Sequence, residues 1–192
     1  MMTVCVFAAS SSKFENEYGK DASRLGSLLA KAGISVVYGG GGIGLMNALA
    51  SAVISNNGNI TGVIPAFMQA EGWGNDGENR TIVTSDMNER KRKMFGLSDA
   101  IVALPGGMGT LEELTEAITL KQLGLFNGPV IILNTCGFYD YFLKFTDNMV
   151  ENNFLRKEHK GMWEVVNSPE EVMEALSRKA GKNRTWRSIA RI

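Results

Sequence analysis

Short runs of β-branched and apolar residues alternate along the chain with segments in which apolar residues recur at helical spacing. The runs predict strands at residues 3–8, 35–38, 60–64, 81–84, 100–104, 130–133 and 163–166. The periodic segments predict helices at residues 22–32, 45–55, 86–97, 110–123, 138–151 and 169–180. Because strands that alternate with helices are typical of an α/β fold, we expect a doubly wound, mostly parallel sheet of about seven strands with helices on both faces.

Two segments interrupt this alternation. Residues 65–80 join two expected strands without a periodic pattern, and loops of that length in compact domains are usually functional or mobile. From Ser177 onward the chain carries six cations and no acidic residue. We therefore expect one domain over residues 1–180 and a basic tail over 181–192, which is either a solvated end or an arm that docks on a partner subunit.

Composition argues against several classes of protein. Twenty basic and twenty acidic residues give a net charge of zero, which disfavours a nucleic-acid-binding protein. No apolar stretch reaches the roughly 18 residues of a membrane span, and the single histidine, His159, cannot supply a Cys/His metal cluster. Cys5 and Cys136 lie in apolar runs, so we expect buried thiols of a reducing compartment. With an N-terminus that has no basic leader, these features predict a cytoplasmic protein without a bound metal.

Glycine is over-represented, with 22 residues against about 13 expected at an average usage of roughly 7%. Eight glycines form two clusters, which consist of Gly39, Gly40, Gly41, Gly42 and Gly44 and of Gly106, Gly107 and Gly109. Each cluster follows an expected strand and precedes an expected helix, where glycine lets backbone N–H groups approach an anion at the positive end of the helix. The alternative is a pair of tight turns that bind no ligand.

The first cluster contains the pattern G-x-G-x-x-G at Gly39, Gly41 and Gly44, which alone is weak evidence for a dinucleotide site. Such a site also needs an acidic residue about 20 positions later, where this chain has Pro65 at the end of the next expected strand. A P-loop needs a Gly-Lys-Ser/Thr sequence, which neither cluster has. The residues therefore favour neither an NAD site nor a P-loop.

The second cluster leads into Thr110 and Glu113. Thr110 is a natural N-cap residue, and a glutamate three positions later completes a capping box. Alternatively, Thr110 and the glycine amides bind a phosphate while Glu113, one turn further, presents its carboxylate to the adjoining sugar. Asp86 and Glu89 repeat the capping spacing ahead of another expected helix.

That helix carries four consecutive cations at residues 90–93. On a 3.6-residue period, Arg90 and Lys91 fall within the apolar stripe that Met94 and Leu97 mark, and the other two cations point elsewhere. A cation on an inward face needs an anionic partner, because burial of an unpaired charge is costly. The partner is either a structural carboxylate or, at a functional site, a phosphate or a catalytic carboxylate.

Residues 105–113, with the sequence PGGMGTLEE, resemble the PGGxGTxxE signature of the LOG ("lonely guy") family. These proteins are cytokinin-activating phosphoribohydrolases that are often mislabelled as lysine decarboxylases. The likeness covers about residues 3–176. Further motifs of the family stand in the same order and at the same spacing at residues 4–7, 37–41, 44–46, 89–91 and 122–124.

The resemblance implies a Rossmann-like fold, usually dimeric, that hydrolyses the N-glycosidic bond of a nucleoside 5′-monophosphate to a free base and ribose 5-phosphate. The nucleotide is a cytokinin ribotide, AMP or both. Arg90 and Glu113 match the catalytic pair of the family. Its nucleotide-binding positions match Glu71, Lys91, Gly107, Met108, Gly109, Thr110, Leu111, Glu112 and Thr119. We expect the first glycine cluster, with Gly40 and Gly41, to complete the sugar-phosphate pocket.

The sequence departs from the usual family pattern in three places. Asn88 replaces a histidine, Asn47 replaces a glycine, and residues 8–9 are Ala-Ala in place of Cys-Gly. We expect these changes to affect substrate preference more than reaction class. We expect no cofactor, because a pyridoxal phosphate decarboxylase needs a Schiff-base lysine and neither glycine cluster contains one.

A second hypothesis is a non-catalytic carrier on the same scaffold, like the related molybdenum cofactor carriers, which holds a phosphorylated ligand without cleaving it. Arg90 together with Glu113 favours hydrolysis. For a nucleotide ligand, Phe67, Met68 and Trp73 of the long loop are candidates to cover the base.

Overall fold

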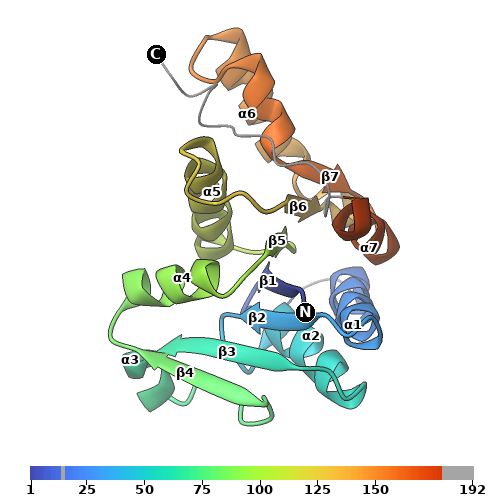
Figure 1. The fold of residues 1–192 in the computed structure, drawn as a ribbon, viewed down its shortest axis with the longest axis vertical. Coiled ribbons are helices and arrows are strands. Elements are labelled where there is room, and N and C mark those ends of the chain that lie inside the picture. Colours follow the sequence, from blue (N-terminus) through green and yellow to red (C-terminus); the bar gives the residue numbers. More distant parts are fainter. Residues whose placement is uncertain (14–15, 179–192) are drawn as a thin grey trace.

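The computed structural model describes residues 1–13 and 16–178, which fold around a seven-stranded sheet (Figure 1). The strands are β1 (Thr3–Phe7), β2 (Ser35–Tyr38), β3 (Ile60–Pro65), β4 (Arg80–Thr84), β5 (Ala100–Ala103), β6 (Val130–Leu133) and β7 (Glu164–Val166). They pair in the order β4-β3-β2-β1-β5-β6-β7, and every pairing is parallel. The predicted α/β fold is confirmed, and each strand begins and ends within one residue of its expected limits.

Helices connect the strands. They are α1 (Asn16–Lys31), α2 (Gly44–Ser55), α3 (Ala66–Ala70), α4 (Met87–Gly96), α5 (Met108–Gln122), α6 (Asp140–Glu151) and α7 (Pro169–Arg178), with the short 3₁₀ turns η1 (Thr135–Gly137) and η2 (Lys157–Met162). The expected helix at 22–32 begins earlier, at Asn16. Its first turns are polar and carry no apolar period, so the sequence pattern did not reveal them. The loop expected at 65–80 contains α3, whose five residues are too few to show a helical pattern.

Side chains alternate across the sheet and bury two apolar layers. Val4 and Val6 of β1 face the layer formed with α1, α2 and α7, whereas Cys5 and Phe7 face the layer formed with α4, α5 and η2. Figure 1 shows α4 and α5 on one side of the sheet and α1 and α7 on the other. Both faces of the sheet are therefore covered, as its continuous apolar strands require.

The strand order places a topological switch point at β1. The chain builds outward from β1 to β4 and then returns to β5 on the opposite side of β1. In open parallel sheets of this kind, ligands bind outside the carboxyl ends of the strands at the switch point. The glycine clusters, which follow β2 and β5, both lie at this edge.

The two cysteines differ in exposure. Cys5 is buried as predicted, but the prediction for Cys136 was wrong, because it lies beyond the end of β6, in η1, with a positive φ of 53° and an exposed side chain.

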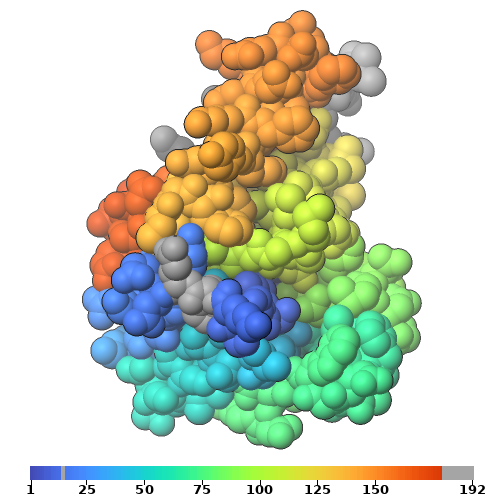
Figure 2. Space-filling model, turned by 180° about the vertical axis from the view of Figure 1, so that it is seen from behind, coloured from blue at the N-terminus to red at the C-terminus, as the bar shows by residue number. Residues whose placement is uncertain are grey.

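The basic tail at 181–192 lies outside the described residues. Figure 2 shows the segment around α6, in orange, projecting at one end of the molecule. Among the described residues, no helix is long and apolar enough to cross a membrane.

Candidate active site

A cavity of about 550 Å³ opens at the carboxyl edge of the sheet. Its walls come from the segments that follow β1, β2, β3 and β5 and from the inner face of α4. Both glycine clusters contribute to it, so they face one common space. The predicted site residues that line the cavity are Arg90, Glu113, Gly41, Gly107, Met108, Gly109, Thr110 and Glu112.

Arg90 is fixed by three acceptors from three different parts of the chain. Its Nε donates to the Val63 carbonyl (2.9 Å), Nη2 to the Gly39 carbonyl (3.1 Å) and Nη1 to Oε1 of Glu113 (2.7 Å). Arg90 is only 6% exposed, which confirms the inward position predicted from the apolar stripe. A Cβ at Gly39 would lie 2.1 Å from Nη2. The absence of a side chain at Gly39 therefore makes room for the guanidinium group.

Helix α4, which carries Arg90, has a capped start. Asp86 is its N-cap, and the Asp86 carboxylate accepts from the Glu89 N–H (2.7 Å), as the sequence spacing predicts. The Glu89 carboxylate accepts from the Ser85 N–H (2.8 Å), one residue before the cap. Arg92 is exposed, in agreement with the expected outward position.

Glu113 lies in the second turn of α5 and is 7% exposed. Burial raises the pKa of its carboxyl group, and the Arg90 guanidinium opposes this rise because it stabilises the carboxylate. The ion pair therefore holds a carboxylate with raised basicity in one orientation at the wall of the cavity. Such a group can accept a proton or stabilise a developing positive charge.

Of the two interpretations of Thr110, the structure contradicts the capping box. Helix α5 begins at Met108 with Gly107 as its N-cap, so Thr110 lies inside the first turn and is buried. Glu113 pairs with Arg90 instead of returning to the cap. A Cβ at Gly106 would lie 2.1 Å from Oγ1 of Thr110, which explains the glycine before the cap.

The start of α5 is suited to an anion. No side chain of the described residues caps it, and its first N–H groups have no intrahelical partner. Gly107, Met108 and Gly109 line the cavity, so the positive end of the helix faces it. The backbone here has the arrangement that binds phosphate groups at helix N-termini.

Lys91 is turned away from the cavity. Its buried ammonium group forms ion pairs with Glu112 and with Glu116 (Nζ–Oε2 2.7 Å), both on α5. The pairing holds Glu112, which lines the cavity mouth, beside Glu113. The structure thus places Lys91 behind the site and not among the residues that line it.

The first glycine cluster binds another part of the chain. The Gly42 N–H donates to the Trp73 carbonyl (3.0 Å), and the Gly40 carbonyl accepts from the Asn75 N–H (3.0 Å). A Cβ at Gly42 would lie 2.7 Å from the Gly74 carbonyl oxygen. Although Gly41 lines the cavity, these polar groups of the cluster hold the segment after α3 and are not available to a phosphate.

Other predicted residues lie outside the cavity lining in the single chain. Glu71 is exposed beyond α3, and Leu111 is half-buried on α5. Thr119 is exposed in the fourth turn of α5, and its hydroxyl donates to the Thr115 carbonyl (2.8 Å). Of the three loop residues expected to cover a base, Met68 and Trp73 line the cavity and Phe67 does not.

Sequence reasoning missed Tyr139, a buried residue at the start of α6. Its hydroxyl donates to the Leu104 carbonyl (2.7 Å), two residues before the second glycine cluster, and its N–H donates to Oδ1 of Asn134 (2.7 Å). Burial and the nearby Glu113 carboxylate raise the pKa of the phenol, so it remains a donor. Tyr139 therefore steadies the turn that leads into α5. A tyrosine in an amphipathic segment is typical of a core residue, and no sequence signal distinguishes it.

Known proteins share this sequence pattern. A family described as "Possible lysine decarboxylase" matches residues 46–176. The cytokinin riboside 5′-monophosphate phosphoribohydrolase LOG of Oryza sativa subsp. japonica is 42% identical over 168 residues, which cover 86% of this chain and 68% of the relative. LOG5 of Arabidopsis thaliana, which has the same enzyme name, is 38% identical over 173 residues, covering 90% and 76% of the two chains.

Solved structures share the fold at lower identity. The molybdenum cofactor carrier protein of Chlamydomonas reinhardtii superposes with a TM-score of 0.70 and 21% identity, and the match covers 94% of this chain and 99% of the carrier. A molybdenum cofactor binding protein from Rippkaea orientalis gives a TM-score of 0.68 at 22% identity, over 92% and 94% of the two chains. These likenesses establish the Rossmann-like architecture, while the extended sequence identity with the plant enzymes shows closer kinship. The chain therefore belongs to the LOG family.

Proposed function

We propose that the protein hydrolyses the N-glycosidic bond of a nucleoside 5′-monophosphate and releases the free base and ribose 5-phosphate. The observation that carries the proposal is the buried Arg90–Glu113 pair, which lies in the same cavity as the uncapped start of α5. LOG and LOG5 are named as phosphoribohydrolases of cytokinin riboside 5′-monophosphates, which supports the same reaction for this chain. The proposed substrates are a cytokinin ribotide and AMP.

In this proposal the start of α5 binds the 5′-phosphate. The amides of residues 107–109 and the helix dipole supply positive potential without a side-chain cation. The ribose then lies against the second turn of the helix, where Glu113 faces the cavity. Phosphate and catalytic carboxylate are thereby held on one rigid element, which fixes their separation.

Glu113 has the catalytic role. Cleavage of the glycosidic bond develops positive oxocarbenium character on the sugar, which a nearby carboxylate stabilises. The bond between the anomeric carbon and the base nitrogen breaks, and its electron pair leaves with the base. Water adds its hydroxyl group to the anomeric carbon, and its proton is transferred to the base. Glu113, with its raised pKa, orients this water and accepts the proton in transit.

Arg90 acts through Glu113. Each of its three guanidinium nitrogens donates to a protein acceptor, so the group is held in place before a substrate binds. Its charge favours the ionised form of Glu113 and so opposes the rise in pKa that burial causes, and its geometry selects one carboxylate orientation. We therefore assign Arg90 as a positioning residue for the carboxylate.

The residues present do not fit the lysine decarboxylase chemistry in the family description. Pyridoxal phosphate enzymes hold their cofactor through a Schiff-base lysine. The described lining of the cavity contains no lysine, and the adjacent Lys91 is paired with Glu112 and Glu116. The proposed reaction accordingly uses no such group.

An assay of base release tests the proposal. The protein is incubated separately with AMP and with isopentenyladenine ribotide, and free base is separated by chromatography. We expect base from at least one nucleotide and none from the corresponding nucleoside, which lacks the phosphate. Nucleotide binding without base release from either compound would contradict the proposal and favour the carrier hypothesis. The likeness to the solved carrier proteins supports a shared fold and no shared function.

We further propose that the protein is a cytoplasmic homodimer. Free thiols at Cys5 and Cys136 suit a reducing compartment such as the cytoplasm.

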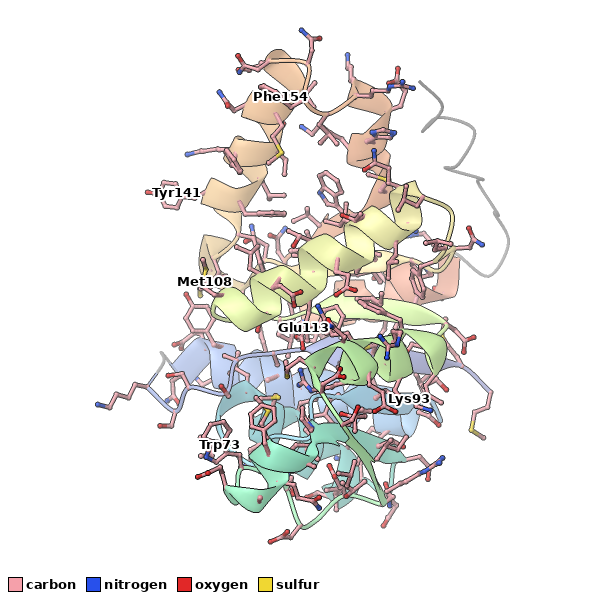
Figure 3. All side chains as sticks on the ribbon, turned by 90° about the vertical axis from the view of Figure 1, so that its left-hand side faces the viewer. Trp73, Lys93, Met108, Glu113, Tyr141 and Phe154 are labelled. Atoms are coloured by element: carbon pink, nitrogen blue, oxygen red, sulfur yellow. The ribbon has the colours of Figure 1, made fainter. Side chains whose placement is uncertain are left out.

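The proposal of a dimer rests on exposed large apolar side chains at Met108, Tyr141 and Phe154, which Figure 3 shows along one side of the molecule. Apolar surface of this kind is typical of an interface. Light scattering should give twice the chain mass, and Tyr141→Asp should shift it toward the monomer; a monomeric parent protein would overturn the proposal.

A further inference from the structure

A tryptophan on the segment between α3 and β4 faces the cavity but has no part in the chemistry described above. Trp73 lines the cavity together with Ile64 of β3 and Met68 of α3. Trp73 is 51% exposed, so its ring is not fully packed in the core. A rigid aromatic side chain at the wall of an open cavity offers a flat apolar surface to a ligand.

The cavity has chemically distinct walls. The start of α5 and the Arg90–Glu113 pair form its polar part, whereas Ile43, Ile64, Met68 and Trp73 contribute an apolar part. Figure 3 shows Trp73 below Met108, with Glu113 between them in height. A nucleoside monophosphate has its phosphate and base at opposite ends of the sugar. With phosphate at α5 and the sugar at Glu113, the base extends toward the apolar wall.

Backbone hydrogen bonds hold Trp73 at this position. Its carbonyl accepts from the Gly42 N–H (3.0 Å), its N–H donates to the Met68 carbonyl (3.2 Å), and a bridge joins Gly41 to Gly74. The Asn75 side chain also donates to Oδ1 of Asn47 (3.4 Å). The first glycine cluster thus holds the backbone from Trp73 to Asn75, and α3 holds the Trp73 N–H.

A second set of contacts secures the far end of the same segment. The Glu78 carboxylate accepts from the Tyr38 hydroxyl (2.6 Å) and from the Thr81 hydroxyl (2.6 Å). A Cβ at Gly62 would lie 2.1 Å from Oε2 of Glu78, so a glycine is required on β3 for the carboxylate to reach this position. Contacts therefore hold the loop from α3 to β4 at two places, so the backbone that carries Trp73 is in place before a ligand binds.

We propose that Trp73 is the platform on which the base of the nucleotide stacks, and hence a specificity-determining residue of the site. The inference rests on the proposed function, because it assumes that phosphate and sugar lie at α5 and Glu113. It assigns the first glycine cluster to holding this platform. Every nucleobase has a π-face, so the platform selects for an aromatic base and tolerates differences between bases.

Binding to two ligands tests the proposal. The affinities of AMP and of ribose 5-phosphate, which lacks the base, are measured by calorimetry in the Glu113→Gln protein, alone and combined with Trp73→Ala, Trp73→Phe or Phe67→Ala. Phe67 is the matched control, because it is 52% exposed on the adjacent α3 and does not line the cavity. Circular dichroism confirms that each variant is folded, and chromatography confirms that AMP stays intact.

We expect Trp73→Ala to weaken AMP binding about 10-fold or more and to change ribose 5-phosphate binding less than about 2-fold. Trp73→Phe should retain most of the AMP affinity, and Phe67→Ala should match the parent for both ligands. Equal effects of Trp73→Ala on both ligands, or an unchanged AMP affinity, would overturn the role of Trp73 and leave the proposed function intact. If the folded Glu113→Gln protein, the parent of these variants, bound neither ligand, both the role of Trp73 and the proposed function would be overturned.

Discussion

Nη1 of Arg90 lies 2.7 Å from Oε1 of Glu113, and this contact joins α4 to α5 at the wall of the cavity. Both residues are almost fully buried, and the other guanidinium nitrogens bind the carbonyl groups of Val63 and Gly39. A buried ion pair adds little stability over well-packed apolar residues, because both charges must be desolvated. Its place in an open cavity is therefore better explained by chemistry than by folding.

Removal of Arg90 should be strongly destabilising. Arg90→Ala leaves the Glu113 carboxylate buried without its counter-charge, and loss of one partner of such a pair costs about 3–5 kcal/mol. Arg92→Ala, on the exposed face of the same helix, should change the free energy of unfolding by about 0.5 kcal/mol or less. Urea unfolding measures both. Equal midpoints for the two variants would show that the pair carries no such penalty.

The pH profile should report the raised pKa of Glu113. The carboxylate is the active form, so kcat/KM should fall as the pH is lowered through a pKa above the ordinary glutamate value of about 4.3. The stability contribution has the opposite sign. Because the folded-state pKa exceeds the unfolded value, this contribution is present below the unfolded pKa and is lost as pH rises through the folded pKa.

Activity should therefore decline on acidification while this carboxyl group favours the folded state. Far-ultraviolet circular dichroism recorded at each pH separates titration from acid unfolding. If kcat/KM stays constant down to a pH near the pKa of a free glutamate side chain, the assignment of Glu113 is contradicted.

Space at Gly39 should be essential for activity. In Gly39→Ala the new Cβ meets Nη2 of Arg90 at 2.1 Å and Sδ of Met46 at 3.0 Å, so the guanidinium must leave its present position. We expect a loss of kcat greater than about 10-fold, because Glu113 loses its orientation. Gly96→Ala is the control, since a Cβ there meets no atom within 4 Å. Unchanged turnover in Gly39→Ala would argue against a positioning role for Arg90.

The inward position of Arg90 and Lys91 could be predicted from helical period, but their partners could not. The period defines which face of α4 is buried, whereas the approach of α5 depends on the order of strands in the sheet. Arg90 consequently meets Glu113, and Lys91 meets Glu112 and Glu116.

The glycine clusters show a similar limit. Sequence alone treats both as anion-binding turns, because both stand between a strand and a helix. The start of α5 faces the cavity without a side-chain cap, whereas the Gly42 N–H and the Gly40 carbonyl of the first cluster bind the distant segment at residues 73–75. The capping box was one of two interpretations of Thr110, because threonine is a favoured N-cap residue; the helix instead has Gly107 as its N-cap, and glycine is also acceptable at that position.

The central claim is that Glu113 carries the cleavage of a bound nucleoside monophosphate. The most direct measurement compares base release from AMP and from isopentenyladenine ribotide by the wild-type protein and by Glu113→Gln at saturating nucleotide, with binding measured alongside. We predict a fall in kcat of about 10²–10⁴-fold with nucleotide affinity within a few-fold of wild type. Turnover by Glu113→Gln within a few-fold of wild type, with nucleotide still bound, would contradict the account.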